Sequence, residues 1–230
     1  MNRREAMLVG GTLAATSMLN AKELKANSSK ELKSSYGTKH EIKPLNFDPK
    51  TLRGISEKVI VSHHDNNYAG AVKKLNLIQK QIAAMPKGVH PIELGALKKE
   101  ELIALNSKLL HELYFDNLGG DAKITAAMQT ILTQSFGSVQ AWQDDFIKTA
   151  KSLSGGSGWV MLSYVPQAQV LINQIAGDHT DSVATGIPLL VMDMYEHSYH
   201  MDYGVKAGKY INAFMQNVDW KMVSQRWEDI

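Results

Sequence analysis

The sequence predicts an α+β protein, with an N-terminal antiparallel helical hairpin domain followed by helices around a small three-stranded antiparallel sheet. Three observations lead to this fold class. Apolar residues recur at helical spacing up to Ser154. Two short apolar, β-branched segments then flank Pro166-Gln167-Ala168, which predicts a β-hairpin. A third apolar run, Ile187 to Met192, predicts the remaining strand.

The first part of the chain has four stretches of helical periodicity, and glycine or proline interrupts the chain after each of the first three. Ser138 follows Gly137 and is expected to cap the fourth helix, because its hydroxyl can accept a free backbone N–H in the first turn. We therefore expect helices over residues 52–85, 97–118, 122–136 and 139–154.

The pattern changes after Gly158. Residues 159–165 and 169–175 are the two arms of the predicted hairpin, and residues 187–192 form the third, fully apolar strand. Helical character returns from Glu196 to Arg226. The sheet should thus lie between helical segments on both sides in the sequence.

Composition and charge exclude several classes of protein. Of the 230 residues, 44% are hydrophobic and 21% are charged, which is typical of a globular protein with a real core. The formal charge is +2, and no basic stripe is present, so nucleic-acid binding is not expected. The chain has no cysteine. Any metal site must therefore use nitrogen and oxygen ligands.

The N-terminus has the layout of an export signal. Arg3 and Arg4 precede an apolar stretch, residues 6–19, that is too short to span a bilayer. The paired arginines resemble a twin-arginine signal, which predicts an exported, periplasmic protein with no stable membrane span. We expect four regions: a signal over 1–26, a linker over 27–44, the helical hairpin domain over 45–121 and the α/β domain over 122–230.

Four side chains form a candidate metal site. His63 and His111 lie in predicted helices, while Asp193 and His197 follow the third strand at a spacing of four residues. Imidazoles with one carboxylate are the ligand set of a redox-active iron or manganese ion. His64 is the alternative to His63, and Asp193 could instead cap a helix.

These residues lie in motifs that resemble the iron/manganese superoxide dismutase family. Residues 193–197, Asp-Met-Tyr-Glu-His, resemble the family signature Asp-x-Trp-Glu-His. Residues 156–159 match its Gly-Ser-Gly-Trp motif, and residues 110–115 resemble its Asn-His-x-x-Phe-Trp segment. Leu75-Asn76 has the expected distance from His63. The resemblance runs from Leu45 to Trp220.

The resemblance implies an oxidoreductase that converts superoxide to oxygen and hydrogen peroxide, with one iron or manganese ion per subunit. It also implies a homodimer, linked through Glu196 and His197 across the interface. Asp178-His179 resembles a family variant in which a histidine lies beside the metal, whereas Ser107 stands where another branch has glutamine. Around the ligands we therefore expect His179, Glu196, Trp159 and Tyr195.

The departures from the family concern access to the metal. Ala71 stands in place of the gateway tyrosine, Asn67 in place of a histidine, and His200 in place of a tyrosine. Tyr68 lies three residues before Ala71 and is expected to supply the missing phenol. His200 is expected to face Asn67 of the partner subunit. Met161 replaces a family tryptophan.

Two other functions are compatible with the same residues. The first keeps the fold and metal site but performs oxidase- or peroxidase-like chemistry, since this ligand set serves several iron enzymes. The second is a non-enzymatic relative that binds metal or a partner protein. The altered access residues support the first of these, whereas the four filled ligand positions argue against the second.

Overall fold

The computed structural model describes residues 34–230. The chain separates into two units, Met1–Thr38 and Lys39–Ile230, which are described individually. In the first unit, residues 34–38 form a turn in which the Thr38 hydroxyl donates to the Ser34 carbonyl (3.2 Å). The predicted signal (1–26) and the first part of the predicted linker (27–33) lie outside the described residues. The division of residues 45–230 at position 121 stays a prediction.

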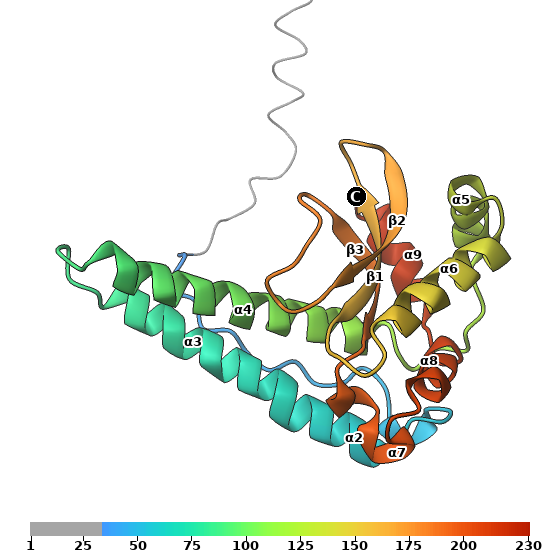
Figure 1. Cartoon of the computed structure of the whole chain (residues 1–230), viewed down its shortest axis with the longest axis horizontal. Coiled ribbons are helices and arrows are strands. Elements are labelled where there is room, and N and C mark those ends of the chain that lie inside the picture. The colour runs from blue at the N-terminus through green and yellow to red at the C-terminus, as the bar shows by residue number, and fades with distance from the viewer. Residues whose placement is uncertain (1–33) are drawn as a thin grey trace, which may run out of the picture. The chain divides into compact units, whose positions relative to one another are not determined.

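The second unit begins with the helical hairpin. α2 (Glu57–Ser62) passes through a π-helical segment, η2 (His63–Tyr68), into α3 (Ala69–Ala83). α3 then runs alongside α4 (Pro91–Asp116), as Figure 1 shows in teal and green. The fold class is confirmed.

Two helices begin five or more residues away from their predicted first residue. The first helix begins at Glu57 instead of Leu52, because Ser56 caps it; a short 3₁₀ turn, η1 (Pro49–Thr51), comes before it. α4 begins six residues earlier than predicted. Its first residue is Pro91, whose fixed φ suits the first helical position and whose missing N–H needs no partner there.

α5 (Ala126–Phe136) and α6 (Val139–Ser152) are divided as predicted. Gly137 has φ 85°, a left-handed conformation that ends α5. The cap at Ser138 is confirmed, because its hydroxyl accepts the backbone N–H of Ala141 (3.0 Å).

The sheet contains β1 (Trp159–Val165), β2 (Val170–Ala176) and β3 (Ile187–Asp193), all antiparallel, in the order β2-β1-β3. Trp159 pairs with Ala176 on one side and Asp193 on the other. Pro188 lies at a register shift in β3, an edge strand, where a residue without an N–H is tolerated. α6 packs on β1 and β2, while α4 and α9 (Trp220–Glu228) pack on β3 (Figure 1).

The predicted helical region 196–226 is divided into short elements. They are η3 (Glu196–Ser198), α7 (His200–Tyr203), α8 (Ala207–Met215) and α9. Gly204, with φ 53°, ends α7. The aromatic core includes Trp142, which packs edge-on against Trp220 at 5.2 Å between ring centroids. Among the described residues, no helix is both long and apolar enough to cross a membrane.

Replacing Gly158 with alanine should destabilise the fold by about 2–4 kcal/mol. Gly158 has φ 137°, and a Cβ there would lie 2.4 Å from the carbonyl oxygen of Ala176. Chemical denaturation of the metal-free protein measures the change. Gly156→Ala is the matched control in the same motif, because its nearest neighbour would be the Leu153 carbonyl at 3.6 Å. Equal stability of the two variants would contradict the prediction.

Candidate metal centre

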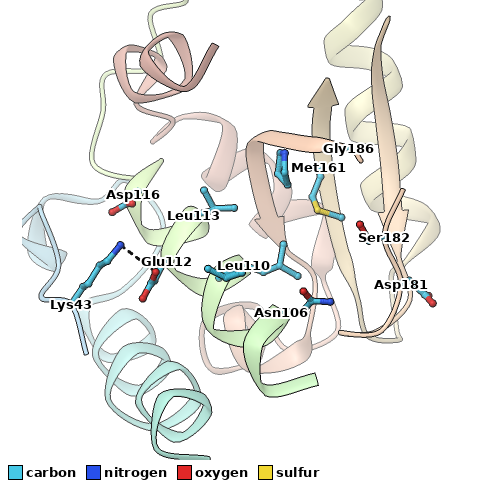
Figure 2. A pocket seen from close by; sticks show the side chains of 12 residues that line it. Lys43, Asn106, Leu110, Glu112, Leu113, Asp116, Met161, Asp181, Ser182 and Gly186 are labelled. Atoms are coloured by element: carbon cyan, nitrogen blue, oxygen red, sulfur yellow. Dashed lines mark ion pairs between the residues drawn. The ribbon is translucent and has the colours of Figure 1, made fainter. Parts of the chain in front are cut away.

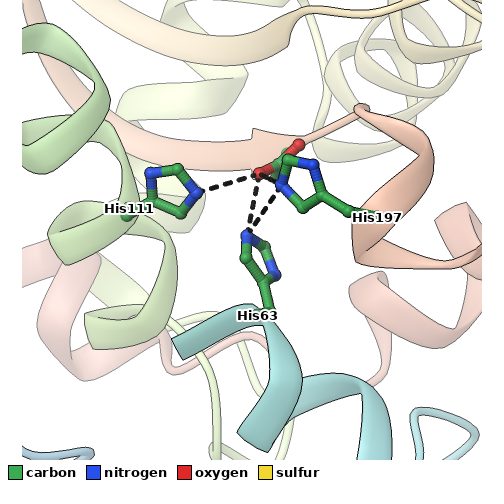
Figure 3. A group of neighbouring side chains, drawn as sticks. His63, His111 and His197 are labelled. Atoms are coloured by element: carbon green, nitrogen blue, oxygen red, sulfur yellow. Dashed lines mark hydrogen bonds and ion pairs between the residues drawn. The ribbon is translucent and has the colours of Figure 1, made fainter. Parts of the chain in front are cut away.

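The structure brings the four candidate ligands together. His63 is the first residue of η2, His111 lies in α4, Asp193 is the last residue of β3, and His197 lies in η3. One ligand atom from each lies within 4.8 Å of the others. Figure 3 shows the three imidazoles converging from separate elements.

A carboxylate oxygen is the common neighbour of the three rings. Asp193 Oδ2 lies 3.0 Å from Nε2 of His63, 3.2 Å from Nε2 of His197 and 3.7 Å from Nε2 of His111. The Nε2 atoms of His63 and His197 are themselves 3.2 Å apart. Three imidazole nitrogens and one carboxylate oxygen aimed at one point are the donor set for a transition metal.

His63 is the first residue of a π-helical segment. A π-helix holds more residues per turn than an α-helix and is frequent at functional sites. Here it occupies six residues, His63 to Tyr68, between two α-helices. His64, the alternative ligand, is bonded instead to Asp65 and to the Lys43 carbonyl, each at 2.8 Å.

The protonation states of His111 and Asp193 suit metal binding, which requires neutral imidazoles and an ionised carboxylate. Nδ1 of His111 lies 2.6 Å from the Ser107 carbonyl and must donate its proton there, which leaves Nε2 as a buried lone pair without a partner among the described residues. Burial lowers the pKa of His111 to about 3. Burial would raise the pKa of Asp193, but the charge and hydrogen bonds of His197 and His63 hold it well below its usual range.

Asp193 is fixed by groups that the sequence pattern does not reveal. Its Oδ1 accepts the backbone N–H of Tyr195 (2.7 Å). Its backbone carbonyl accepts the hydroxyls of Tyr210 (2.7 Å) and Ser198 (3.0 Å). Tyr210 comes from α8, and nothing in its local sequence indicates this contact. The carboxylate is thus held in one orientation before any ion binds.

His179 lies beside the four ligands. Its ring centroid is 6.3 Å from that of His111 and 5.6 Å from that of Trp159. The Asn106 side chain, on the same helix as His111, donates to the His179 carbonyl (2.7 Å). Nothing in the sequence around Asn106 indicates this contact. Trp159 itself is fully buried and packs edge-on against His111 at 5.0 Å.

Comparison with known proteins identifies the family. A family model described as iron/manganese superoxide dismutases, C-terminal domain, matches residues 124–226. An iron superoxide dismutase of Cupriavidus metallidurans is 50% identical over 189 residues, which cover 82% of this chain and 96% of the relative. The chain belongs to the iron/manganese superoxide dismutase family. A manganese superoxide dismutase of Halobacterium salinarum is 30% identical over 200 residues (84% and 97% of the two chains). An iron superoxide dismutase of Aquifex aeolicus is 31% identical over 199 residues (82% and 92%).

Three residues predicted to line the approach to the metal make no direct contact of this kind with the candidate ligands. Among the described residues, no hydrogen bond or ring contact joins Asn67, Ala71 or His200 to the four ligands. His200 and Glu196 are exposed, whereas Asn67 and Ala71 are partly buried. A role for these residues in a dismutase of this family stays a prediction.

The Tyr68 hydroxyl is hydrogen-bonded to residues other than the four candidate ligands. It donates to Glu112 Oε1 (2.8 Å) and accepts the backbone N–H of Lys43 (2.9 Å). Glu112 also pairs with Lys108 (2.8 Å) and Lys43 (3.2 Å). Burial and the neighbouring Glu112 carboxylate raise the pKa of Tyr68. Its phenol therefore belongs to a buried ion network in this member of the family.

A cavity of about 420 Å³ lies beside α4 and near that network. Its walls include Leu110, Leu113 and Met161, and the Lys43–Glu112 ion pair is also among its lining residues (Figure 2). Met161 stands where the family resemblance indicates a tryptophan, a much larger side chain. None of the four candidate ligands lines the cavity.

The metal-free protein should lose stability as the pH falls below about 6.5. The pKa of His111 is lowered from 6.5 to about 3, so the unfolded state binds a proton that the folded state does not bind. Protons therefore favour unfolding throughout this window, and burial lowers the pKa of His63 in the same direction. Urea unfolding between pH 7.5 and 4 measures the slope of the unfolding free energy against pH. His111→Gln should reduce it, and an unchanged slope in that variant would contradict the assignment.

Proposed function

We propose that the chain is a superoxide dismutase with one iron or manganese ion held by His63, His111, Asp193 and His197. The observation that carries this proposal is the convergence of four ligand atoms within 4.8 Å around a buried carboxylate. The family membership and the names of the relatives support the reaction and the choice of ions.

The side chains of this protein would set the position of the ion and the net charge of the metal site. Held by these four residues, a bound iron or manganese ion would supply one-electron redox chemistry between its +3 and +2 states. In the overall reaction one superoxide is oxidised to oxygen, and a second superoxide, with two protons, is reduced to hydrogen peroxide. Three neutral imidazoles and one carboxylate bring a single negative charge, which leaves a trivalent or divalent ion with net positive charge to attract an anion. Trp159 and His179 enclose the site on the side of His111.

Metal analysis and a superoxide assay test the proposal together. The purified protein should contain close to one iron or manganese per subunit and remove superoxide rapidly. His111→Ala should lose both, whereas His90→Asn should change neither. His90 caps the same helix through its side chain, and asparagine can keep that cap.

The other outcomes have defined meanings. Stoichiometric metal without superoxide removal would overturn the proposal in favour of oxidase- or peroxidase-like chemistry. Absence of bound metal after refolding with either ion would favour a non-enzymatic relative.

We expect a homodimer in which Glu196 helps to hold the last ligand of the partner subunit. Glu196 is exposed in the single chain, and the His197 side chain beside it is 28% exposed although it lies among the candidate ligands. Glu196→Ala should shift sedimentation from dimer towards monomer and reduce retained metal, about 10–100-fold in affinity. Glu228→Ala, an exposed change in α9, is the control. A monomeric wild-type protein at micromolar concentration would contradict this expectation.

We also propose export through the twin-arginine segment. The support is the pair Arg3-Arg4 before the apolar stretch 6–19. A reporter fused after residue 44 should reach the periplasm in a bacterium with that export system. Replacement of both arginines by lysine should keep it in the cytoplasm, and unchanged export would contradict the proposal.

A further inference from the structure

The side chain of Tyr195 makes a contact that the family signature does not offer at this position, where a tryptophan is expected. Its hydroxyl lies 3.3 Å from Nδ1 of His179. The two rings are stacked, with centroids 5.1 Å apart and an interplanar angle of 15°. On its other side, Tyr195 stacks on the candidate ligand His197 at 5.4 Å and 23°.

The opposite nitrogen of His179 has no hydrogen-bond partner in the described part of the chain. Nε2 is buried and makes no hydrogen bond with any described residue. A buried ring nitrogen left unpaired is costly, whether it carries a proton or a lone pair. This nitrogen therefore points to a ligand or solvent molecule that would enter beside the rings of His111 and Trp159.

We propose that Tyr195 is a positioning residue that donates its hydroxyl proton to Nδ1 of His179 and so fixes the proton of the neutral imidazole on Nε2. A neutral imidazole has one N–H and one lone pair, and the hydrogen bond made by one nitrogen decides the state of the other. His179 then presents an N–H donor at Nε2 to the candidate metal site, and not a lone pair. An N–H suits an oxygen anion, which a lone pair would repel.

The surroundings favour this direction of donation. A second polar side chain near the Tyr195 hydroxyl is that of Ser157, which already donates its own proton to the Gly177 carbonyl (3.2 Å). Tyr195 could donate to either group, but an imidazole lone pair is the stronger acceptor. The loop that carries His179 is held independently, since Asn106 donates to its carbonyl. Tyr195 therefore acts on the ring while Asn106 holds the backbone.

The proposal rests on the proposed function for its meaning in catalysis, but its first test does not require activity. Two-bond proton–nitrogen spectra of the metal-free protein, with ¹⁵N-labelled histidine, report the tautomer of each ring. The His179 signal is assigned by its loss in His179→Gln. Wild-type His179 should be protonated on Nε2, and Tyr195→Phe should produce a mixture of both tautomers. Tyr164→Phe, which removes a hydroxyl in β1 against Trp227, should leave the spectrum unchanged.

The second test separates positioning from a purely structural role. Phenylalanine keeps both ring stacks, so the fold of Tyr195→Phe should survive. In the metal-loaded protein, Tyr195→Phe should shift the midpoint potential, and the shift should vanish in the His179→Gln background. Protonation of wild-type His179 on Nδ1, an unchanged tautomer in Tyr195→Phe, or an equal potential shift in both backgrounds would each overturn the proposal. Failure of superoxide removal with the expected tautomers would overturn the proposed function alone.

Discussion

Asp193→Asn is expected to abolish the binding of iron and manganese. The substitution keeps the shape of the side chain but removes the only carboxylate among the four candidate ligands, and its amide N–H₂ cannot act as a ligand. Removing one partner of a buried charge pair costs about 3–5 kcal/mol, or at least a hundredfold in affinity. Metal content after dialysis and superoxide removal should fall together.

The metal-free form provides the control for this variant. Without an ion, Asp193 is a fully buried charge held by imidazole hydrogen bonds, so a neutral asparagine should leave the metal-free fold intact. Asp229→Asn, near the C-terminus, should bind metal as the wild type does. Normal metal content in Asp193→Asn would refute the ligand assignment, because no loss of folding could account for it.

Asn117→Ala should destabilise the protein by about 3–5 kcal/mol. Asn117 is fully buried at the end of α4. Its side chain accepts the N–H of Val191 (3.0 Å) and donates to the carbonyl of the same residue (3.2 Å). Asn117 thus makes the two backbone hydrogen bonds with Val191 that a further strand would make at the open edge of β3. Alanine would leave both backbone groups buried without these partners.

Chemical denaturation of metal-free Asn117→Ala measures this loss. Asn212→Ala, an exposed change in α8, should stay within about 0.5 kcal/mol of the wild type. Because Val191 is two residues from Asp193, Asn117→Ala should also weaken metal retention. A denaturation midpoint equal to that of Asn212→Ala would contradict the role of Asn117.

Periodicity was sufficient to predict the fold class, because each helix and strand carries its own apolar pattern. The three strands were predicted to within one residue at each end. The π-helical segment at His63 was not predicted, since local spacing does not distinguish it from an α-helix. The start of α4 was misplaced because a proline can begin a helix as well as interrupt a chain.

The candidate site was only partly predictable, for a similar reason. The four ligands were found because their chemistry is concentrated in two residue types at motif spacing. Asn106, Tyr210 and Asn117 act through contacts with residues far away in the sequence. Their positions depend on how the helices pack against the sheet, and no single stretch of sequence encodes that packing.

The separation of His63 and His197 along the chain has a consequence for folding kinetics. Their Nε2 atoms are 3.2 Å apart, although 134 residues separate them in sequence. The full ligand set exists only after the hairpin has docked against the sheet, and we expect such a long-range contact to form late in folding. A bound ion should therefore act mainly after the folding barrier, slowing unfolding while leaving the folding rate nearly unchanged. The metal-loaded protein would therefore be kinetically stable, because it unfolds slowly.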